Sequence, residues 1–364
     1  MTLIEQLKQI PDHRHLRGRR HPLWMLLILS LLGFLCGYRG YRPLADFAQQ
    51  HDAQLRELLG LADAQPMPSY STFRRTSLTV DSQGWVTVFN EWAIATLPPS
   101  AEVLASIDGK SIRCTSVGGQ TAEQNFTTVV SMYERHLGVL HLRLMENAKS
   151  SEIHVAQVLM ADVLPQLPPG YCLSLDALHT TAATVTTIVE AQHHYLLPVK
   201  QNRAHTHAAI EVIATTVPPH SEATEVDESH GRRVQRHAQV FPPSPALAAK
   251  WPKLAFVGAV HRSGERDQKA FAETVYYLGS APWTAIDLLH ASRQHWQIEN
   301  ELHWIKDVTF EEDYPPRRGG YAPVTWSIFN TFAITLARRQ GWRTVPQALR
   351  AWANQLDRVF SFLV

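Results

Sequence analysis

The sequence has few cysteines and no strong excess of either charge. Only three cysteines occur among 364 residues, Cys36, Cys114 and Cys172, and no two of them have CxxC spacing. An odd number of widely separated cysteines argues against a disulfide framework and is typical of reduced thiols in a cytosolic protein. Lysine and arginine together number 34 against 33 acidic residues, so the formal net charge is +1. A balanced total does not exclude nucleic acid, because one face can be basic while the rest is not.

A hydrophobic run long enough to cross a membrane is also missing. The most apolar stretch, Pro22–Cys36, is shorter than the ~20 residues that a spanning helix needs. Arginines precede it, as in a signal peptide, but no small-residue cleavage site follows. We therefore expect a buried core helix rather than a membrane anchor. The chain also lacks a Walker loop and a dinucleotide fingerprint, and its near-neighbour histidine pairs lack zinc-ligand spacing.

The periodicity of apolar residues divides the chain into four segments. Residues 1–98 have helical spacing and predict an N-terminal helical domain. Residues 99–200 contain apolar runs in the order strand-strand-strand-helix-strand-helix-strand, which predicts an α/β fold with a mixed sheet. Residues 201–281 are too long for a bare connection and predict a β-rich insertion. Residues 282–364 are expected to be helical, with one helix from about Pro282 to Val308.

Three carboxylates carry the chemistry that the sequence suggests. Asp108 in IDGK and Asp176 in SLDAL each lie where a predicted strand ends, and Glu299 lies within the predicted helix. Taken singly, each aspartate is most simply a turn residue. Together, carboxylates from two strands and a helix suit two hard divalent cations, Mg²⁺ or Mn²⁺, which favour oxygen ligands and catalyse phosphoryl transfer.

Basic side chains around these carboxylates are expected to hold DNA phosphates. His295, Glu299 and Lys306 are spaced to share one face of an uninterrupted helix, which predicts Glu299 on the metal and the other two on phosphate oxygens. Alternatively, His295 packs against its tryptophan neighbour and Lys306 points into solvent. Lys110 and Lys200 are expected to add positive charge.

Two groups of arginines in the N-terminal segment are candidates for DNA binding. The first comprises Arg14, Arg17, Arg19 and Arg20. The second, Arg74–Arg75, lies in a helix expected to begin at Ser69 or Ser71. Guanidinium groups neutralise phosphates, so binding through them should weaken steeply with salt. The alternative is a solvated basic segment that binds nothing.

Several motifs, in this order, resemble the bacterial insertion-sequence DDE transposases of the H-repeat-associated type. The motifs are IPDHRHLRGRRHPLWMLLILSLLGFLCGYRGYRPLADFA, PSYSTFRR, IDGKSIR, KSSEI, LDALHT, YLLPVKQNR and HWQIENELHWIKDVTFEED. The similarity covers nearly the whole chain. It implies a ribonuclease-H-like catalytic core with an inserted β segment, and an acidic triad formed by Asp108, Asp176 and Glu299.

The resemblance also implies binding partners, and this sequence departs from the family pattern at two positions. Wider relatives carry a tyrosine, an arginine and a lysine around the glutamate, whereas Ser292 and His295 stand at the first two of these positions here. The implied partner is double-stranded DNA, both element ends and target. Cutting at two ends favours a homodimer on DNA, in the cytoplasm at the nucleoid. A nuclease that cuts without integration and a catalytically silent DNA-binding derivative are the alternatives.

Overall fold

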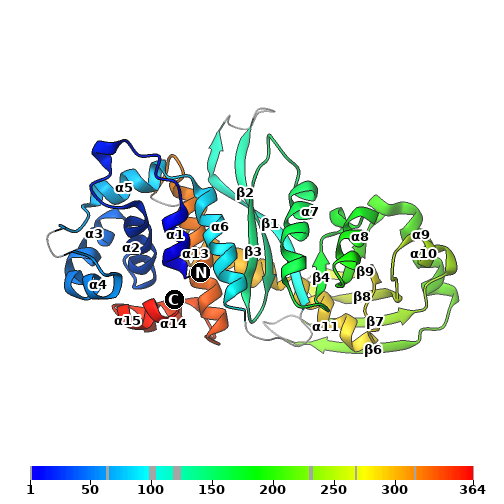
Figure 1. Ribbon diagram of the computed structural model, residues 1–364. Helices are drawn as coiled ribbons and strands as arrows, with labels where there is room; N and C mark the ends of the chain where they lie inside the picture. Colours follow the sequence, from blue (N-terminus) through cyan, green and yellow to red (C-terminus); the bar gives the residue numbers. More distant parts are fainter. Residues whose placement is uncertain are drawn as a thin grey trace.

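The computed structural model describes residues 2–62, 65–97, 104–117, 124–228, 233–266, 269–314 and 317–363 (Figure 1). Its first helices are α1 (Leu3–Gln9), α2 (Leu23–Leu35), α3 (Tyr41–Gln50), α4 (Asp52–Leu59), α5 (Tyr70–Thr79) and α6 (Ser82–Ala95). Helix α2 is the apolar run, and it is buried in a hydrophobic core, as expected. Among the described residues, no helix is both long and apolar enough to cross a membrane.

Local signals set the ends of these helices. Thr2 and Glu5 form a capping box at the start of α1, in which each side chain accepts a hydrogen bond from the other residue's backbone amide. Gly60 ends α4 with a left-handed φ of 62°, a conformation that glycine adopts without strain. Ser69 is the N-cap of α5, which agrees with the predicted helix start.

In the described part of the chain, nine strands form one mixed sheet. They are β1 (Leu104–Val117), β2 (Asn125–Glu134), β3 (Gly138–Glu146), β4 (Cys172–Leu175), β5 (His194–Val199), β6 (Ser221–Asp227), β7 (Val234–Phe241), β8 (Phe256–Arg266) and β9 (Lys269–Gly279), in the order β3-β2-β1-β4-β5-β9-β8-β7-β6. Strand β4 is parallel to β1 and β5, and the other neighbouring pairs are antiparallel. The expected mixed α/β sheet is therefore present. The predicted insertion extends this sheet, because β9 pairs with β5.

Helices cover both faces of the sheet (Figure 1). On one face lie α7 (Glu152–Val163), α8 (Ala182–Glu190), α9 (Ala204–Thr216) and α10 (Pro245–Lys250), in a core that includes Ala105 and Ile107 of β1. On the other face, α11 (Ala285–His295) packs on a core that Leu104 adjoins. Side chains alternate along a strand, so Asp108 projects toward the same face as Leu104 and α11.

The C-terminal helices pack with the N-terminal ones. Helices α13 (Ala322–Arg339), α14 (Val345–Trp352) and α15 (Leu356–Ser361) share one hydrophobic core with α1–α6, and the rings of Trp85 and Phe329 meet edge-on at 4.9 Å. The prediction grouped 282–364 with the catalytic core. Helix α13 is buried from Ala322 to Ala337 and contacts both β3 and α6, so it packs against the sheet and the N-terminal helices. The predicted boundary between residues 98 and 99 lies outside the described residues.

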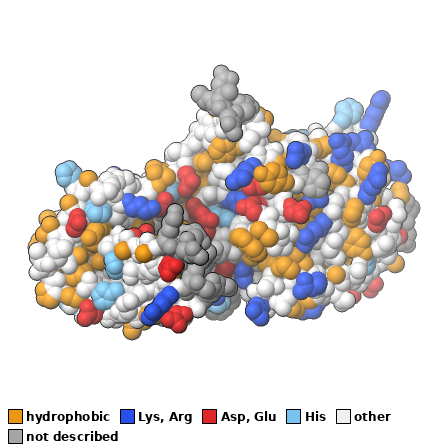
Figure 2. Space-filling model, turned by 180° about the vertical axis from the view of Figure 1, so that it is seen from behind, with side chains coloured by type: hydrophobic (Ala, Val, Ile, Leu, Met, Phe, Trp, Pro, Cys, Tyr) orange, Lys and Arg blue, Asp and Glu red, His pale blue; other side chains and the backbone are white. Residues whose placement is uncertain are grey.

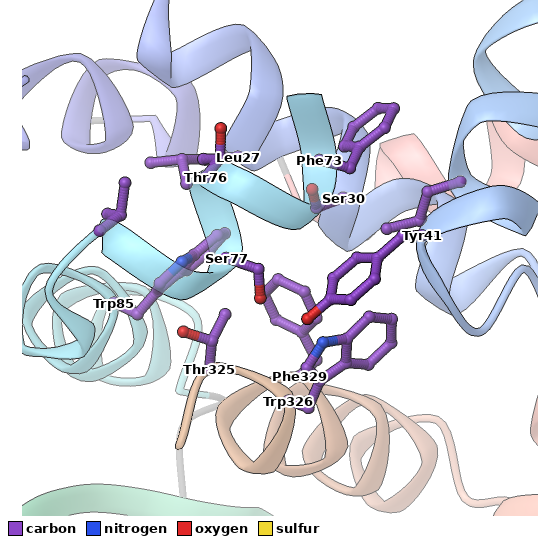
Figure 3. Close-up of a pocket in the computed structure, with 12 residues that line it drawn as sticks. Leu27, Ser30, Tyr41, Phe73, Thr76, Ser77, Trp85, Thr325, Trp326 and Phe329 are labelled. Atoms are coloured by element: carbon purple, nitrogen blue, oxygen red, sulfur yellow. The ribbon is translucent and has the colours of Figure 1, made fainter. Parts of the chain in front are cut away.

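A small cavity of about 20 Å³, lined mainly by apolar side chains, lies inside this shared core (Figure 3). Tyr41, Ser77 and Trp326 line it, and their buried polar side-chain atoms have no hydrogen-bond partner among the described residues. A cavity of this size with three polar side-chain atoms in its wall accommodates one water molecule. It is too small for a substrate and belongs to the packing of α5 against α13.

Candidate functional site

Asp108 and Asp176 lie side by side on parallel strands. Ile107 of β1 pairs with Leu175 of β4, and each aspartate is the next residue along its chain. Asp176 follows the end of β4, as predicted. The predicted strand end at Asp108 is wrong, because β1 continues to Val117 through its pairing with β2. The pairing of β1 with β4 stops just before Asp108, at Ile107 and Leu175. Both carboxylates therefore lie where the two strands separate.

The helix expected from Pro282 to Val308 begins at Ala285 and is interrupted after His295. Thr284 and Asp287 form the capping box of α11, which ends at His295. The residues Glu299–His303 then form a π-helical turn, in which the Trp304 amide donates to the Glu299 carbonyl, and α12 (Trp304–Val308) follows. A π turn contains one extra residue, so later side chains are rotated by about 100° from their α-helical positions.

The π turn brings two side chains to Asp108. Ligand atoms of Asp108, Glu299 and His303 all lie within 4.8 Å of one another. The distance between Asp108 Oδ2 and His303 Nδ1 is 3.6 Å. Asp176 is not in this group, although it borders Asp108 through the strand pairing. His303 was not among the residues predicted from the sequence; its position one turn after Glu299, on the same predicted helix, was the available signal.

Burial dominates the electrostatics of this group. The pKa of Asp108 is raised to about 7: burial is the largest cause, a hydrogen bond from the Gly109 amide lowers the pKa, and the negative charges of the neighbouring carboxylates Glu152, Glu299 and Asp176 raise it. Burial also lowers the pKa of His303 to about 3, assisted by Lys306 and Lys110. His303 is therefore a neutral imidazole near pH 7 and does not form an ion pair with Asp108. A carboxylate that resists ionisation beside a neutral imidazole fits a divalent cation, which would stabilise the ionised carboxylate.

Asp176 is more exposed and is held in its ionised form. Partial burial pushes its pKa up, but the Ala177 amide and the Lys200 ammonium outweigh that effect, and the net pKa is lowered. Lys200 Nζ lies 3.3 Å from Asp176 Oδ1, so Lys200 lies at this edge of the sheet. His295 lies nearby, with Nδ1 2.9 Å from Ser174 Oγ. Burial lowers the pKa of His295 despite the attraction of Asp176.

The structure does not bring Lys306 or Lys110 to an open phosphate-binding face. The extra residue of the π turn rotates Lys306 inward, where it is 1% exposed and its Nζ lies 3.9 Å from Glu312 Oε1. The prediction that it lines a DNA groove is therefore wrong, and so is the solvent-facing alternative. Lys110 is 8% exposed, and its Nζ lies 2.7 Å from Asp307 Oδ1. Both lysines connect elements of the fold.

Glu152 is a fourth carboxylate at the site, and it was not among the residues predicted from the sequence. It is the first residue of α7, and its charge contributes to the raised pKa of Asp108. A Cβ built on Gly109 would lie 3.0 Å from Glu152 Oε2, so glycine at this position gives the carboxylate room. Glu152 Oε1 lies 3.1 Å from His179 Nε2. Its signal was the KSSEI motif, which precedes a predicted helix.

The N-terminal arginines fall into two structural groups. Arg14 holds its own loop together, because it forms a bidentate pair with Asp12 and donates to the His21 carbonyl. Arg19 donates to two backbone carbonyls of the same loop. Arg17, Arg20, Arg74 and Arg75 are exposed.

A cleft of about 650 Å³ lies between this loop and α5. Its basic lining residues are Arg14, Arg17, Arg20, Arg75, His13, His15 and His21. Arg74 and Arg19 are not among the lining residues. In the view from behind, lysine and arginine side chains gather over the half of the molecule that contains the N-terminal helices (Figure 2). The cleft joins arginines from both sequence groups on one surface.

Clustered carboxylates at the edge of a mixed sheet are the kind of site that metal-dependent phosphoryl transfer requires. The chain belongs to the DDE transposases: residues 99–315 match the family described as "Transposase DDE domain", and residues 4–93 match "DDE_Tnp_1-associated". It is similar to "Putative transposase YncI" of Escherichia coli O157:H7, with 27% identity over 93% of this chain and 87% of that protein. It is also similar to "H repeat-associated putative transposase YhhI" of Escherichia coli K12, with 25% identity over 92% of this chain and 89% of that protein. The family predicted from the motifs is confirmed.

Proposed function

We propose that this protein cleaves DNA at the ends of its element and joins those ends to target DNA by metal-dependent phosphoryl transfer. One observation carries the proposal: in a chain of the transposase family, Asp108 and Glu299 converge on one point while Asp176 borders Asp108 on the next strand. The proposed ligands of Mg²⁺ or Mn²⁺ are Asp108, Asp176 and Glu299. A pair of such ions activates the attacking oxygen and stabilises the leaving oxygen.

The chain's own side chains have separate roles in this proposal. Asp108 and Glu299 approach from the sheet and from the π turn, so the packing of α11 on the sheet sets the distance between them. Lys200 is exposed beside Asp176, and its ammonium is free to approach a DNA phosphate from the solvent side. His295 is fixed by Ser174, and its lowered pKa means that its ring gains the charge needed to bind phosphate only at acidic pH.

We further infer that β1–β5, with their helices, form a ribonuclease-H-like core. The support is the order β3-β2-β1-β4-β5, in which an antiparallel three-stranded unit continues through two strands parallel to β1. This order places Asp108 and Asp176 on adjoining strands. Strands β6–β9 are then an insertion that lengthens the sheet on the far side of β5.

The proposed DNA-binding surface is the basic cleft between the 11–21 loop and α5. Arg17, Arg20 and Arg75 are exposed and line it, so their guanidinium groups are available to phosphates. Arg14 and Arg19 are proposed to act indirectly, by holding the loop in shape. Two ends must be cut for one element to move, so we propose a homodimer on double-stranded DNA at the nucleoid.

Cleavage and joining of the element's own ends test the catalytic proposal. The full-length protein is incubated with duplexes that carry the DNA flanking its gene, in Mg²⁺ or Mn²⁺. Asp108→Asn, Asp176→Asn and Glu299→Gln should each abolish cleavage and retain duplex binding, whereas Glu190→Gln, an exposed carboxylate on α8, should behave as wild type. Cleavage that persists in excess chelator would refute the metal mechanism. Cleavage without joining would favour the alternative of a nuclease that does not integrate DNA. Binding without cleavage would favour the alternative of a catalytically silent DNA-binding derivative.

Salt-dependent binding tests the DNA surface. Each phosphate contact that is lost should reduce the slope of log K against log salt by about 0.9. The triple variant Arg17→Ala/Arg20→Ala/Arg75→Ala should therefore bind duplex DNA more weakly and with a shallower slope. Arg350→Ala, an exposed arginine on α14, is the matched control. An unchanged slope in the triple variant would remove the cleft from the DNA interface.

A further inference from the structure

We propose that His303 is a metal ligand alongside Asp108 and Glu299, and that its imidazole makes the site prefer Mn²⁺ to Mg²⁺. This inference rests on the proposed metal-dependent function of the same site. It adds a residue and a metal preference that three carboxylates alone would not provide.

The first support is the geometry of the three donors. Ligands at ~2.1 Å from one cation lie about 3–4 Å from each other. Asp108 Oδ2 and His303 Nδ1 are 3.6 Å apart, which falls in that range and exceeds a hydrogen-bond distance. The ligand atoms of Asp108, Glu299 and His303 lie within 4.8 Å of one another, so small side-chain movements would place all three around one ion.

The second support is the unsatisfied burial of the imidazole. His303 is 7% exposed, and its Nε2 has no hydrogen-bond partner among the described residues. A buried polar group that lacks a partner costs about 1–3 kcal/mol, so such groups in folded proteins call for an explanation. Coordination of a cation through Nδ1 would place the ring proton on Nε2, which still lacks a partner among the residues that the structure describes, so the support lies in the binding energy that the cation would add to a ring buried at this cost. Lys110 and Lys306 are paired with Asp307 and Glu312 and do not compete for the ring.

The third support is that the backbone is arranged to bring His303 to this point. Glu299 and His303 are the first and last residues of the π turn, and both ligand atoms reach Asp108. π turns are rare and occur frequently at functional sites. A nitrogen donor among two carboxylates disfavours Mg²⁺, which prefers oxygen ligands in a near-ideal octahedron, and favours the transition ions of the Irving–Williams series.

Direct metal binding tests this proposal without DNA. Mn²⁺ bound to the full-length protein is measured by electron paramagnetic resonance, Mg²⁺ by competition, and directly bound imidazole by its ¹⁴N coupling in pulsed spectra. We expect wild-type protein to bind Mn²⁺ more tightly than Mg²⁺ and to show the ¹⁴N coupling. His303→Asn offers an amide oxygen in place of the ring nitrogen, and it should lose the coupling and about tenfold or more in Mn²⁺ affinity while Mg²⁺ affinity changes less. His136→Asn, in an exposed turn, is the matched control.

The outcomes separate this inference from the proposed function. Mn²⁺ bound with no ¹⁴N coupling, or with coupling that persists in folded His303→Asn, would overturn the role of His303. The proposed function would survive the loss of this role for His303 if Asp108→Asn still abolished both Mn²⁺ binding and cleavage. Wild-type protein that binds neither ion at millimolar concentration and cleaves nothing would overturn both.

Discussion

Replacing Lys306 with alanine should destabilise the fold rather than remove a DNA contact. Lys306 Nζ donates to Ser327 Oγ at 3.1 Å and lies 3.9 Å from Glu312 Oε1, in a network that joins α12 to α13. Glu312 is 3% exposed and also accepts hydrogen bonds from Ser327 and Asn330. Without the lysine, that carboxylate would remain buried next to two neutral donors and would lose its paired ammonium.

The magnitude follows from this burial. Removing one partner of a buried ion pair costs about 3–5 kcal/mol, and the two remaining donors to Glu312 place the expected cost near the lower end. With an unfolding entropy of ~2.1 cal/mol/K per residue over 364 residues, about 3 kcal/mol lowers Tm by about 4 °C if the chain unfolds cooperatively. Lys306→Met combined with Glu312→Gln removes both charges and should recover most of the loss.

Thermal unfolding of Lys306→Ala, the double variant and a control measures this effect. Lys149→Ala is the matched control, because Lys149 is 72% exposed and a surface change of this kind should cost less than about 0.5 kcal/mol. At a temperature where Lys306→Ala remains folded, its affinity for duplex DNA should equal that of wild type. A wild-type Tm together with weakened DNA binding or cleavage would show that Lys306 faces DNA and that our reasoning about the π turn is wrong.

Three further predictions concern the site and its support. The gain in stability of Asp108→Asn over wild type, in the metal-free protein, should be larger at pH 8 than at pH 5 by on the order of 2–3 kcal/mol in chemical denaturation. The reason is that the pKa of Asp108 is about 7 in the folded protein and ordinarily 3.8, so the stability of wild type falls as pH rises between these values. An equal effect at both pH values would contradict the raised pKa. Lys200→Ala, which changes an exposed ammonium beside Asp176, should reduce cleavage rate with little change in Tm, and an unchanged rate would remove Lys200 from the site. Gly138→Ala should lower Tm by several degrees, since φ is +75° and the new Cβ would lie 2.5 Å from the Thr335 backbone; an unaltered Tm would mean that α13 can shift away from β3.

The sequence alone was sufficient for the family, the mixed sheet and the placement of two aspartates in one sheet. Asp108 and Asp176 could be assigned to that sheet because each follows a short apolar run, whereas the pairing of β1 with β4 came only from the structure. The core helix at Pro22–Cys36 followed from length and hydropathy. These inferences depend on local patterns, either periodicity or motif order, and do not require knowledge of which helices and strands pack against each other.

Only the tertiary structure decided which charged residues share a surface. Glu299, His303 and Lys306 have spacings that an α-helix would place on one face, yet one extra residue in the π turn leaves the first two beside Asp108 and turns Lys306 into the core. Such a turn is set by packing on both sides of the helix, which a single sequence does not reveal. Lys110 is buried for the same kind of reason: its partner Asp307 comes from α12, and only the fold brings α12 to β1. Sequence determines which side chains are available, and long-range packing determines whether each one faces a ligand or another charge.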